Sequence, residues 1–106
     1  MYKILIVDDE AKIREVLCEY AEFEGYAPDQ AGDGMEAVQK CRQNHYDLVL
    51  MDVMMPKLDG FSAVKEIKKI KDIPVIMLSA RGEEYDKLFG FEIGADDYVV
   101  KPFSPK

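Results

Sequence analysis

Short apolar runs alternate with segments of helical periodicity along the whole chain. Residues 3–7 (KILIV) form a β-branched, nearly continuous apolar run, which is typical of a strand buried on both faces. Comparable runs occupy residues 48–51, 74–78 and 97–100. Because helical segments separate these runs, the pattern predicts an α/β fold in which an open parallel sheet carries helices on both faces, joined by right-handed crossovers.

Four segments have the apolar spacing of an amphipathic helix, namely residues 11–24, 35–44, 61–70 and 83–91. Gly25 follows the first of them, at the position where a glycine commonly ends a helix. These helical faces are expected to pack on the sheet. The apolar residues that define the first two faces are Ile13, Val16, Leu17, Tyr20, Ala21, Met35, Val38 and Cys41.

Two weaker signals complete the pattern. Residues 26–31 (YAPDQA) predict a weak strand, and Pro28 has no N–H to donate to a neighbour, which favours a place at the sheet edge. Residues 104–106 (SPK) have the pattern of the N-cap and first turn of a further helix. We therefore expect this fifth helix, and any effector domain after it, to be absent from this chain.

Composition limits the class of protein. The 106 residues fit one domain over residues 1–106, and a hydrophobic fraction of 48% with 33% charged residues excludes a disordered chain. The net charge of −7 argues against direct binding of nucleic acid or of anionic membranes. No membrane span or signal peptide is recognisable. Cys18 and Cys41 lie in helical patterns and are expected to be reduced thiols in a cytoplasmic protein.

Polar side chains follow the predicted central strands where each strand ends. Asp8 and Asp9 follow the first strand, Asp52 the third, Ser79 the fourth and Lys101 the fifth. In an open α/β sheet the ligand site lies outside these carboxyl ends. Three carboxylates repel each other unless a cation is present, and hard oxygen ligands suit Mg²⁺. The lysine and the hydroxyl can contact phosphoryl oxygens, which leaves Asp52 as the best candidate nucleophile for aspartyl-phosphate chemistry.

Each of these residues also has an ordinary structural interpretation. Asp9 alone reads as a helix cap, Ser79 as a loop or cap residue, and Lys101 as a solvated charge. Helix caps and loops would not explain why carboxylate, hydroxyl or ammonium groups follow all four of the other strands and are missing only after the predicted edge strand. The presence of these polar groups together at one edge of the sheet therefore favours a phosphoryl or metal site.

Four segments resemble the receiver domain of two-component response regulators, and the likeness covers essentially the whole chain. They are ILIVDDE, DLVLMDVMMPKLDGF, PVIMLSA and GADDYVVKPFSPK. The last segment is especially similar to the subclass fused to winged-helix DNA-binding domains. The resemblance implies a flavodoxin-like sheet of five strands in the order 2-1-3-4-5.

The resemblance also implies roles for the acidic residues. Asp52 matches the phosphoacceptor, which takes a phosphoryl group from the phosphohistidine of a sensor histidine kinase. Asp8 and Asp9 match the acidic pair that holds Mg²⁺. Asp52 would share the ion, and Met54 matches the position whose backbone carbonyl is a further ligand, for which no particular side chain is needed.

The remaining matched residues form the switch. By the resemblance, Lys101 contacts the phosphoryl group, Ser79 turns toward it, and Tyr98 rotates inward, which reshapes the surface of the fourth helix and fifth strand. The domain would act as a switch and not as an enzyme on other substrates, and it would control an output domain that regulates transcription. By the same resemblance, homodimerisation on phosphorylation would use the fourth helix, fifth strand and fifth helix, where basic residues of the fifth helix meet the acids Glu92, Asp96 and Asp97.

Three other functions conflict with particular residues of the sequence. An Mg²⁺-dependent phosphohydrolase that forms an aspartyl-phosphate is the main alternative, but it needs a general acid two residues after the nucleophile, where Met54 stands. A flavin or dinucleotide carrier needs a phosphate-binding loop after the first strand, where Asp8 and Asp9 would repel the phosphate. A receiver-like domain that is not phosphorylated should lack one of Asp9, Asp52 or Lys101, and none is missing.

Overall fold

The computed structural model describes residues 1–53, 55, 58–79 and 96–100, with the backbone alone for residue 79 and residues 97–100. Within this part, a parallel sheet of five strands has the order β2-β1-β3-β4-β5. This order confirms the predicted flavodoxin-like sheet and places β2, which contains Pro28, at an edge. The strands are β1 (Lys3–Val7), β2 (Ala27–Ala31), β3 (Leu48–Asp52), β4 (Val75–Ser79) and β5 (Asp97–Val100).

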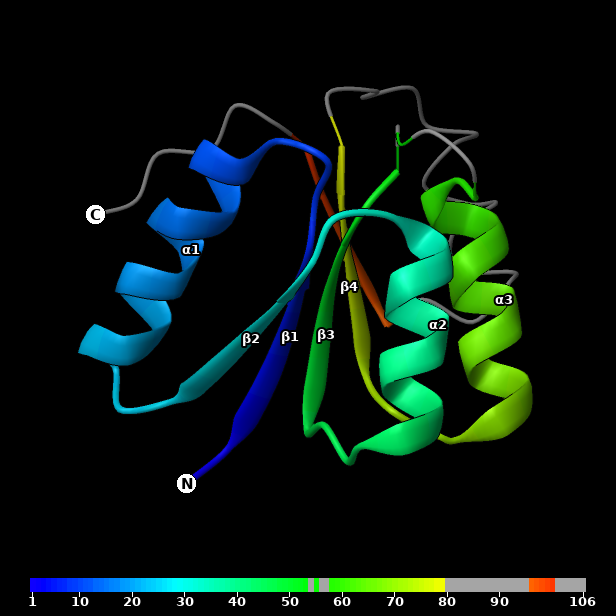
Figure 1. Ribbon diagram of the computed structural model, residues 1–106, viewed down its shortest axis with the longest axis horizontal. Helices are drawn as coiled ribbons and strands as arrows, with labels where there is room; N and C mark the ends of the chain where they lie inside the picture. Colours follow the sequence, from blue (N-terminus) through cyan, green and yellow to red (C-terminus); the bar gives the residue numbers. More distant parts are fainter. Residues whose placement is uncertain (54, 56–57, 80–95, 101–106) are drawn as a thin grey trace.

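Three helices are described: α1 (Ala11–Phe23), α2 (Gly34–Gln43) and α3 (Gly60–Ile70). Figure 1 shows α1 on one side of the sheet and α2 and α3 side by side on the other, so the predicted three-layer arrangement is confirmed for these elements. The helix predicted at residues 83–91 and the helix start at residues 104–106 lie outside the described residues. In the described part of the chain, no helix has the length and apolar character needed to cross a membrane.

The alternation of side chains along the strands builds two cores. Leu5 and Val7 of β1 belong to the larger core, which also includes buried residues of β3, β4, α2 and α3. Ile4 and Ile6 point the other way and pack with Cys18 of α1. All four apolar residues of β1 are buried, which confirms the prediction of a strand covered on both faces.

The helix ends agree with the local sequence signals. The side chains of Asp33 and Asp59 accept hydrogen bonds from the N–H groups of Glu36 and Ser62 and so cap α2 and α3. Gly25 follows α1 with a φ of +88°, a left-handed conformation that only glycine adopts at little cost.

The predicted helical faces were partly wrong. Val16 and Tyr20 of α1 are each 48% exposed, and Met35 of α2 is 54% exposed, although all three were expected to face the sheet. Cys18 and Ala21 are the buried residues of α1. The helix is rotated so that Cys18 and Ala21 face the sheet, Leu17 packs against the same core, and Val16 and Tyr20 lie on its flank.

Candidate functional site

Strand register brings two of the predicted acids together at the carboxyl edge of the sheet. Val7 of β1 pairs with Met51 of β3. Asp8 directly follows β1 and Asp52 is the last residue of β3, so the two residues lie side by side at the ends of neighbouring strands. Asp8 is 1% exposed and Asp52 is 5% exposed. Carboxylates are rarely buried to this extent unless a cation or several hydrogen-bond donors compensate the lost hydration.

Register also orders the other predicted site residues. Ser79 ends β4 and pairs with Val100, the residue before Lys101, while Tyr98 pairs with Met77 two residue pairs deeper in the sheet. The backbone therefore brings Ser79 and the end of β5 to the same edge as Asp52. Met54 and Lys101 lie outside the described residues, so their predicted roles stay predictions.

The acidic segment, residues 8–10, gathers three carboxylates. One carboxylate oxygen from each of Asp8, Asp9 and Glu10 lies within 4.8 Å of the others. The N–H of Glu10 donates a 2.9 Å hydrogen bond to Oδ1 of Asp8, which draws the segment into a tight bend. Among the described residues, Asp52 is not a member of this group. Glu10 was not among the predicted ligands, although its place directly after two aspartates in the sequence could have suggested it.

The chemistry of this edge fits a hard divalent cation. The side-chain donors of the acidic segment are all carboxylate oxygens, which Mg²⁺ prefers in proteins, and Asp9 and Glu10 are exposed to solvent that could complete an octahedral shell. Asp52 adds a fourth carboxylate from the neighbouring strand. The residues present are therefore suited to Mg²⁺.

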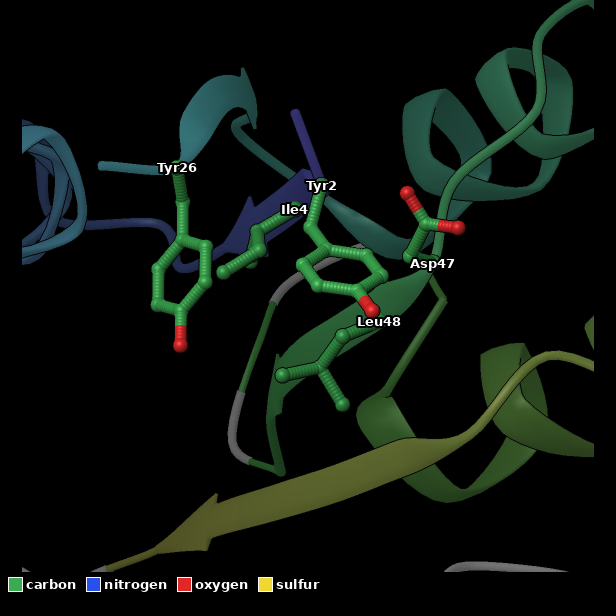
Figure 2. Close-up of a pocket in the computed structure, with 5 residues that line it drawn as sticks. All are labelled: Tyr2, Ile4, Tyr26, Asp47 and Leu48. Carbon is green, nitrogen blue, oxygen red and sulfur yellow. The ribbon is translucent and has the colours of Figure 1, made fainter. Parts of the chain in front are cut away.

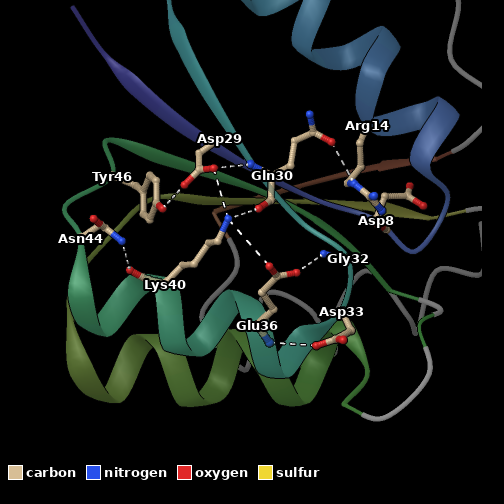
Figure 3. A network of polar contacts seen from close by, with 10 residues as sticks. All are labelled: Asp8, Arg14, Asp29, Gln30, Gly32, Asp33, Glu36, Lys40, Asn44 and Tyr46. Carbon is tan, nitrogen blue, oxygen red and sulfur yellow. Dashed lines mark hydrogen bonds and ion pairs between the residues drawn. The ribbon is translucent and has the colours of Figure 1, made fainter.

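The backbone of the acidic segment is held from two sides. The N–H of Asp8 donates a 3.2 Å hydrogen bond to the carbonyl of Ala31, at the end of β2. Arg14 of α1 donates through Nη1 to the carbonyl of Asp8 at 2.6 Å and through Nε to Oε1 of Gln30 at 3.0 Å. Figure 3 shows the Arg14 side chain between Gln30 and Asp8.

The start of α3 lies against the backbone of Asp52. The N–H of Gly60 donates a 2.9 Å hydrogen bond to the carbonyl of Val53. A Cβ atom at position 60 would overlap the carbonyl oxygen of Asp52 and would stand 2.8 Å from Cα of Val53. Glycine is thus required at position 60 because the helix approaches the site strand closely.

A polar network connects the edge strand β2 to α2. Asp29 accepts hydrogen bonds from the hydroxyl of Tyr46 at 2.6 Å, the N–H of Gln30 at 2.8 Å and Nζ of Lys40 at 3.2 Å (Figure 3). Burial raises the pKa of Asp29, but these three donors outweigh burial and hold the pKa below its usual value. Burial and the adjacent carboxylate raise the pKa of Tyr46. Both groups therefore keep their usual charge at neutral pH.

Asp96, which the resemblance placed in a dimer interface, makes hydrogen bonds within the chain. Its Oδ2 accepts from the N–H of Val75 at 2.8 Å and from Nζ of Lys68 at 3.0 Å. Burial raises the pKa of Asp96, whereas these two donors lower it, and the net shift is downward. The carboxylate therefore joins α3 to the starts of β4 and β5.

An open pocket lies at the opposite end of the strands. It is lined by Tyr2, Ile4, Tyr26, Asp47 and Leu48, and Figure 2 shows the two tyrosine rings beside the aliphatic side chains. Ile4 and Leu48 lie near the starts of their strands, whereas the acids follow the ends. This pocket is therefore separate from the acidic edge.

Comparison with known proteins agrees with this geometry. Residues 4–106 match the family model of the response regulator receiver domain. The chain is 53% identical over 104 residues to the transcriptional regulatory protein ResD of Bacillus subtilis, covering 98% of this chain and 43% of that protein. It is 48% identical over 106 residues to the CpxR homologue of Haemophilus influenzae, covering 100% of this chain and 46% of the relative. The chain thus spans less than half the length of these relatives.

Solved structures similar to this chain are also response regulators. A Francisella response regulator receiver domain has a TM-score of 0.93 and 40% identity, covering 98% of this chain and 87% of that one. The response regulator protein TrrA of Thermotoga maritima, solved in complex with Mg²⁺ and BeF, has a TM-score of 0.88 and 44% identity, covering 98% and 90%. With buried aspartates at the carboxyl edge of a sheet of order 2-1-3-4-5, and a family match over residues 4–106, the chain belongs to the response regulator receiver domain family.

Proposed function

We propose that this chain is a phosphoryl-accepting switch whose acceptor is Asp52. The observation that carries the proposal is the burial of Asp8 and Asp52 side by side at the carboxyl ends of β1 and β3. A carboxylate in such a site is oriented by its strand, and a carboxylate can act as the nucleophile that forms an aspartyl-phosphate. Family membership supports the same role.

Mg²⁺ is the proposed cofactor. The ligands would be the carboxylates of Asp8, Asp9 and Asp52 together with the backbone carbonyl of Met54. The oxygen donors of the acidic segment support this, as does the Mg²⁺ complex of the related TrrA. When bound, the ion would supply positive charge to the oxygens of the transferring phosphoryl group.

The reaction follows from the acceptor. A carboxylate oxygen of Asp52 attacks the phosphorus of a phosphohistidine on a sensor histidine kinase, in line with the P–N bond. A P–O bond forms, the P–N bond breaks, and the imidazole nitrogen leaves with the electron pair. Lys101 holds a phosphoryl oxygen with its ammonium group. Asp52 then carries an acyl phosphate, and the protein catalyses only its own phosphorylation and dephosphorylation.

The added charge drives the output. A phosphoryl group brings about −1.5 to −2 charges to the edge of the sheet. The hydroxyl of Ser79, at the adjacent end of β4, turns toward it, and Tyr98 of β5 moves into the space that is left. This local change biases a two-state surface next to β5, which is how charge-driven switches commonly act.

The proposed output is control of transcription through a DNA-binding domain in the full-length protein, in the cytoplasm, with homodimerisation on phosphorylation. The names of the two relatives ResD and CpxR, both transcriptional regulatory proteins, support this output. The greater length of those relatives leaves room for such a domain.

Acetyl phosphate provides a direct test. With Mg²⁺, intact-mass spectrometry should show one added phosphoryl group that hydroxylamine removes, as expected for an acyl phosphate. Asp52→Asn should abolish the added mass, whereas Asp72→Asn, at an exposed aspartate outside the site, should keep it. Labelling that persists in Asp52→Asn would place the acceptor elsewhere. Rapid turnover of many equivalents of acetyl phosphate would favour the phosphohydrolase alternative.

A further inference from the structure

The acidic segment has a specific anchor on α1. The guanidinium of Arg14 bridges two elements, because it donates to the carbonyl of Asp8 and to the side chain of Gln30. We propose that Arg14 is a positioning residue for the divalent cation, which it serves by holding the acidic segment in the conformation that binds the ion. This inference rests on the proposed function, since it concerns the same cation.

The contacts of Asp8 show why one side chain can have this effect. Its carbonyl accepts from Nη1 of Arg14 at 2.6 Å, its N–H donates to Ala31 at 3.2 Å, and its Oδ1 accepts from the N–H of Glu10. The Arg14 side chain ties the carbonyl of Asp8 to α1, while the carbonyl of Glu10 accepts a 3.1 Å hydrogen bond from the backbone N–H of Arg14. Without the side-chain bond, the peptide that joins Asp8 to Asp9 loses its fixed orientation, and the directions of both carboxylates depend on that peptide.

The other end of the anchor is itself fixed. Gln30 lies on β2, and its backbone carbonyl accepts a 2.5 Å hydrogen bond from Nζ of Lys40 on α2. Its N–H donates to Asp29, which Lys40 also contacts. The guanidinium of Arg14 therefore spans from the acidic segment to a strand that is held by side chains of another helix (Figure 3). Such indirect support orients ligands in metal sites generally.

Electrostatics allows a clear test, because the charge of Arg14 alone and its positioning role predict opposite changes in cation affinity when Arg14 is replaced. Three carboxylates within 4.8 Å repel one another, so the segment tends to open when it is not restrained. A cation such as Arg14 close to the site also repels Mg²⁺, and removing it should tighten binding if charge were its main contribution. If positioning dominates, removing it should weaken binding. The sign of the change separates the two.

Cation affinity is measured with Mn²⁺, because the electron paramagnetic resonance signal of the unbound ion decreases when the ion binds. Calorimetry with Mg²⁺ is the second measurement. Arg14→Met is expected to raise the dissociation constant about tenfold, the lower end of the range for residues that support metal ligands. Lys12→Met removes the same charge from an exposed position of α1 and should change the constant less than about twofold. The difference should persist in 0.5 M KCl, where exposed charges are screened.

Titrations are made at a temperature at which circular dichroism shows each variant folded, so a loss of stability alone does not alter the dissociation constant. Gln30→Met is the second variant if Arg14→Met fails to fold, because it removes one acceptor and leaves the guanidinium; it should weaken binding severalfold. Unchanged or tighter binding in these variants overturns the inference and leaves the proposed function intact. Absence of Mn²⁺ and Mg²⁺ binding in the parent chain overturns both.

Discussion

The hydroxyl of Tyr46, on a side chain that is 1% exposed, donates a 2.6 Å hydrogen bond to Oδ2 of Asp29. The bond joins the segment before β3 to the edge strand β2, which pairs with β1 alone in the described sheet. Pro28 cannot donate to a ladder, so side-chain bonds take a larger share in holding this strand. The same strand carries Gln30, on which the Arg14 anchor depends.

Replacing Tyr46 with phenylalanine should lower the free energy of unfolding by about 1.5 to 3 kcal/mol, the usual contribution of a hydrogen bond to a charged acceptor. Urea unfolding followed by circular dichroism measures the loss. Tyr20→Phe is the matched control, since Tyr20 is 48% exposed on α1, and it should change stability by less than about 0.5 kcal/mol. Equal effects of the two substitutions would show that the Tyr46 bond contributes nothing specific.

The free energy of unfolding should decrease at acid pH because Asp29 becomes protonated. Its folded-state pKa is lowered by its three donors, so the unfolded chain binds the proton more tightly than the folded chain does. The stabilisation is therefore present above the unfolded-state pKa of about 4 and is lost as the pH falls through the lowered folded-state pKa. Asp29→Asn should be less stable than the parent at pH 7, and the difference should shrink toward pH 2. A difference that is constant from pH 7 to pH 2 would contradict this assignment.

Gly60→Ala should destabilise the fold by about 2 kcal/mol or more, because the added Cβ meets the backbone of Asp52 and Val53. Since the clash displaces α3 from the acceptor strand, phosphoryl labelling by acetyl phosphate should also slow. Gly32→Ala is the matched control. Its Cβ would stand 3.6 Å from the nearest atom, so stability should stay within about 0.5 kcal/mol of the parent. Urea unfolding and labelling rates measure both effects.

Both thiols should resist modification in the folded protein. Cys18 and Cys41 are buried, and burial raises the pKa of Cys41 to about 11 and raises that of Cys18 as well. Because the thiolate is the reactive form, a disulfide reagent at pH 8 should react at least about tenfold more slowly than it does in 6 M guanidinium chloride. Colorimetric titration counts two thiols after denaturation. Fast reaction of the native protein would mean that these helices open readily.

Lys101→Ala tests the switch. We expect Asp52 still to be labelled in the presence of Mg²⁺, while the change in tyrosine fluorescence on labelling falls by roughly half or more, because a charge-assisted contact to the phosphoryl group is lost. The chain has six tyrosines and no tryptophan, so tyrosine dominates this signal. Lys65→Ala, at an exposed lysine of α3, should keep the parent response. An unchanged response in Lys101→Ala would reduce this lysine to a surface charge.

Local sequence patterns were sufficient for much of the architecture. The apolar run of β1 predicted a strand covered on both faces, and Pro28 predicted an edge strand; both predictions were confirmed. The positions of Asp8 and Asp52 directly after apolar runs predicted their place at the carboxyl edge. These features are readable because side-chain period and backbone chemistry act over a few residues, and because parallel connections allow few topologies.

Other features depend on contacts between distant segments. Apolar spacing marks a helical face but leaves the rotation of α1 about its axis open by tens of degrees, so Val16 and Tyr20 were misplaced. The place of Glu10 directly after Asp8 and Asp9 could have suggested their grouping, but the bonds of Arg14 to Asp8 and Gln30 follow from no local pattern. Those contacts form only when α1 has docked on β1 and β2 and strand register has been set, because their energy comes from groups that the chain brings together from far apart.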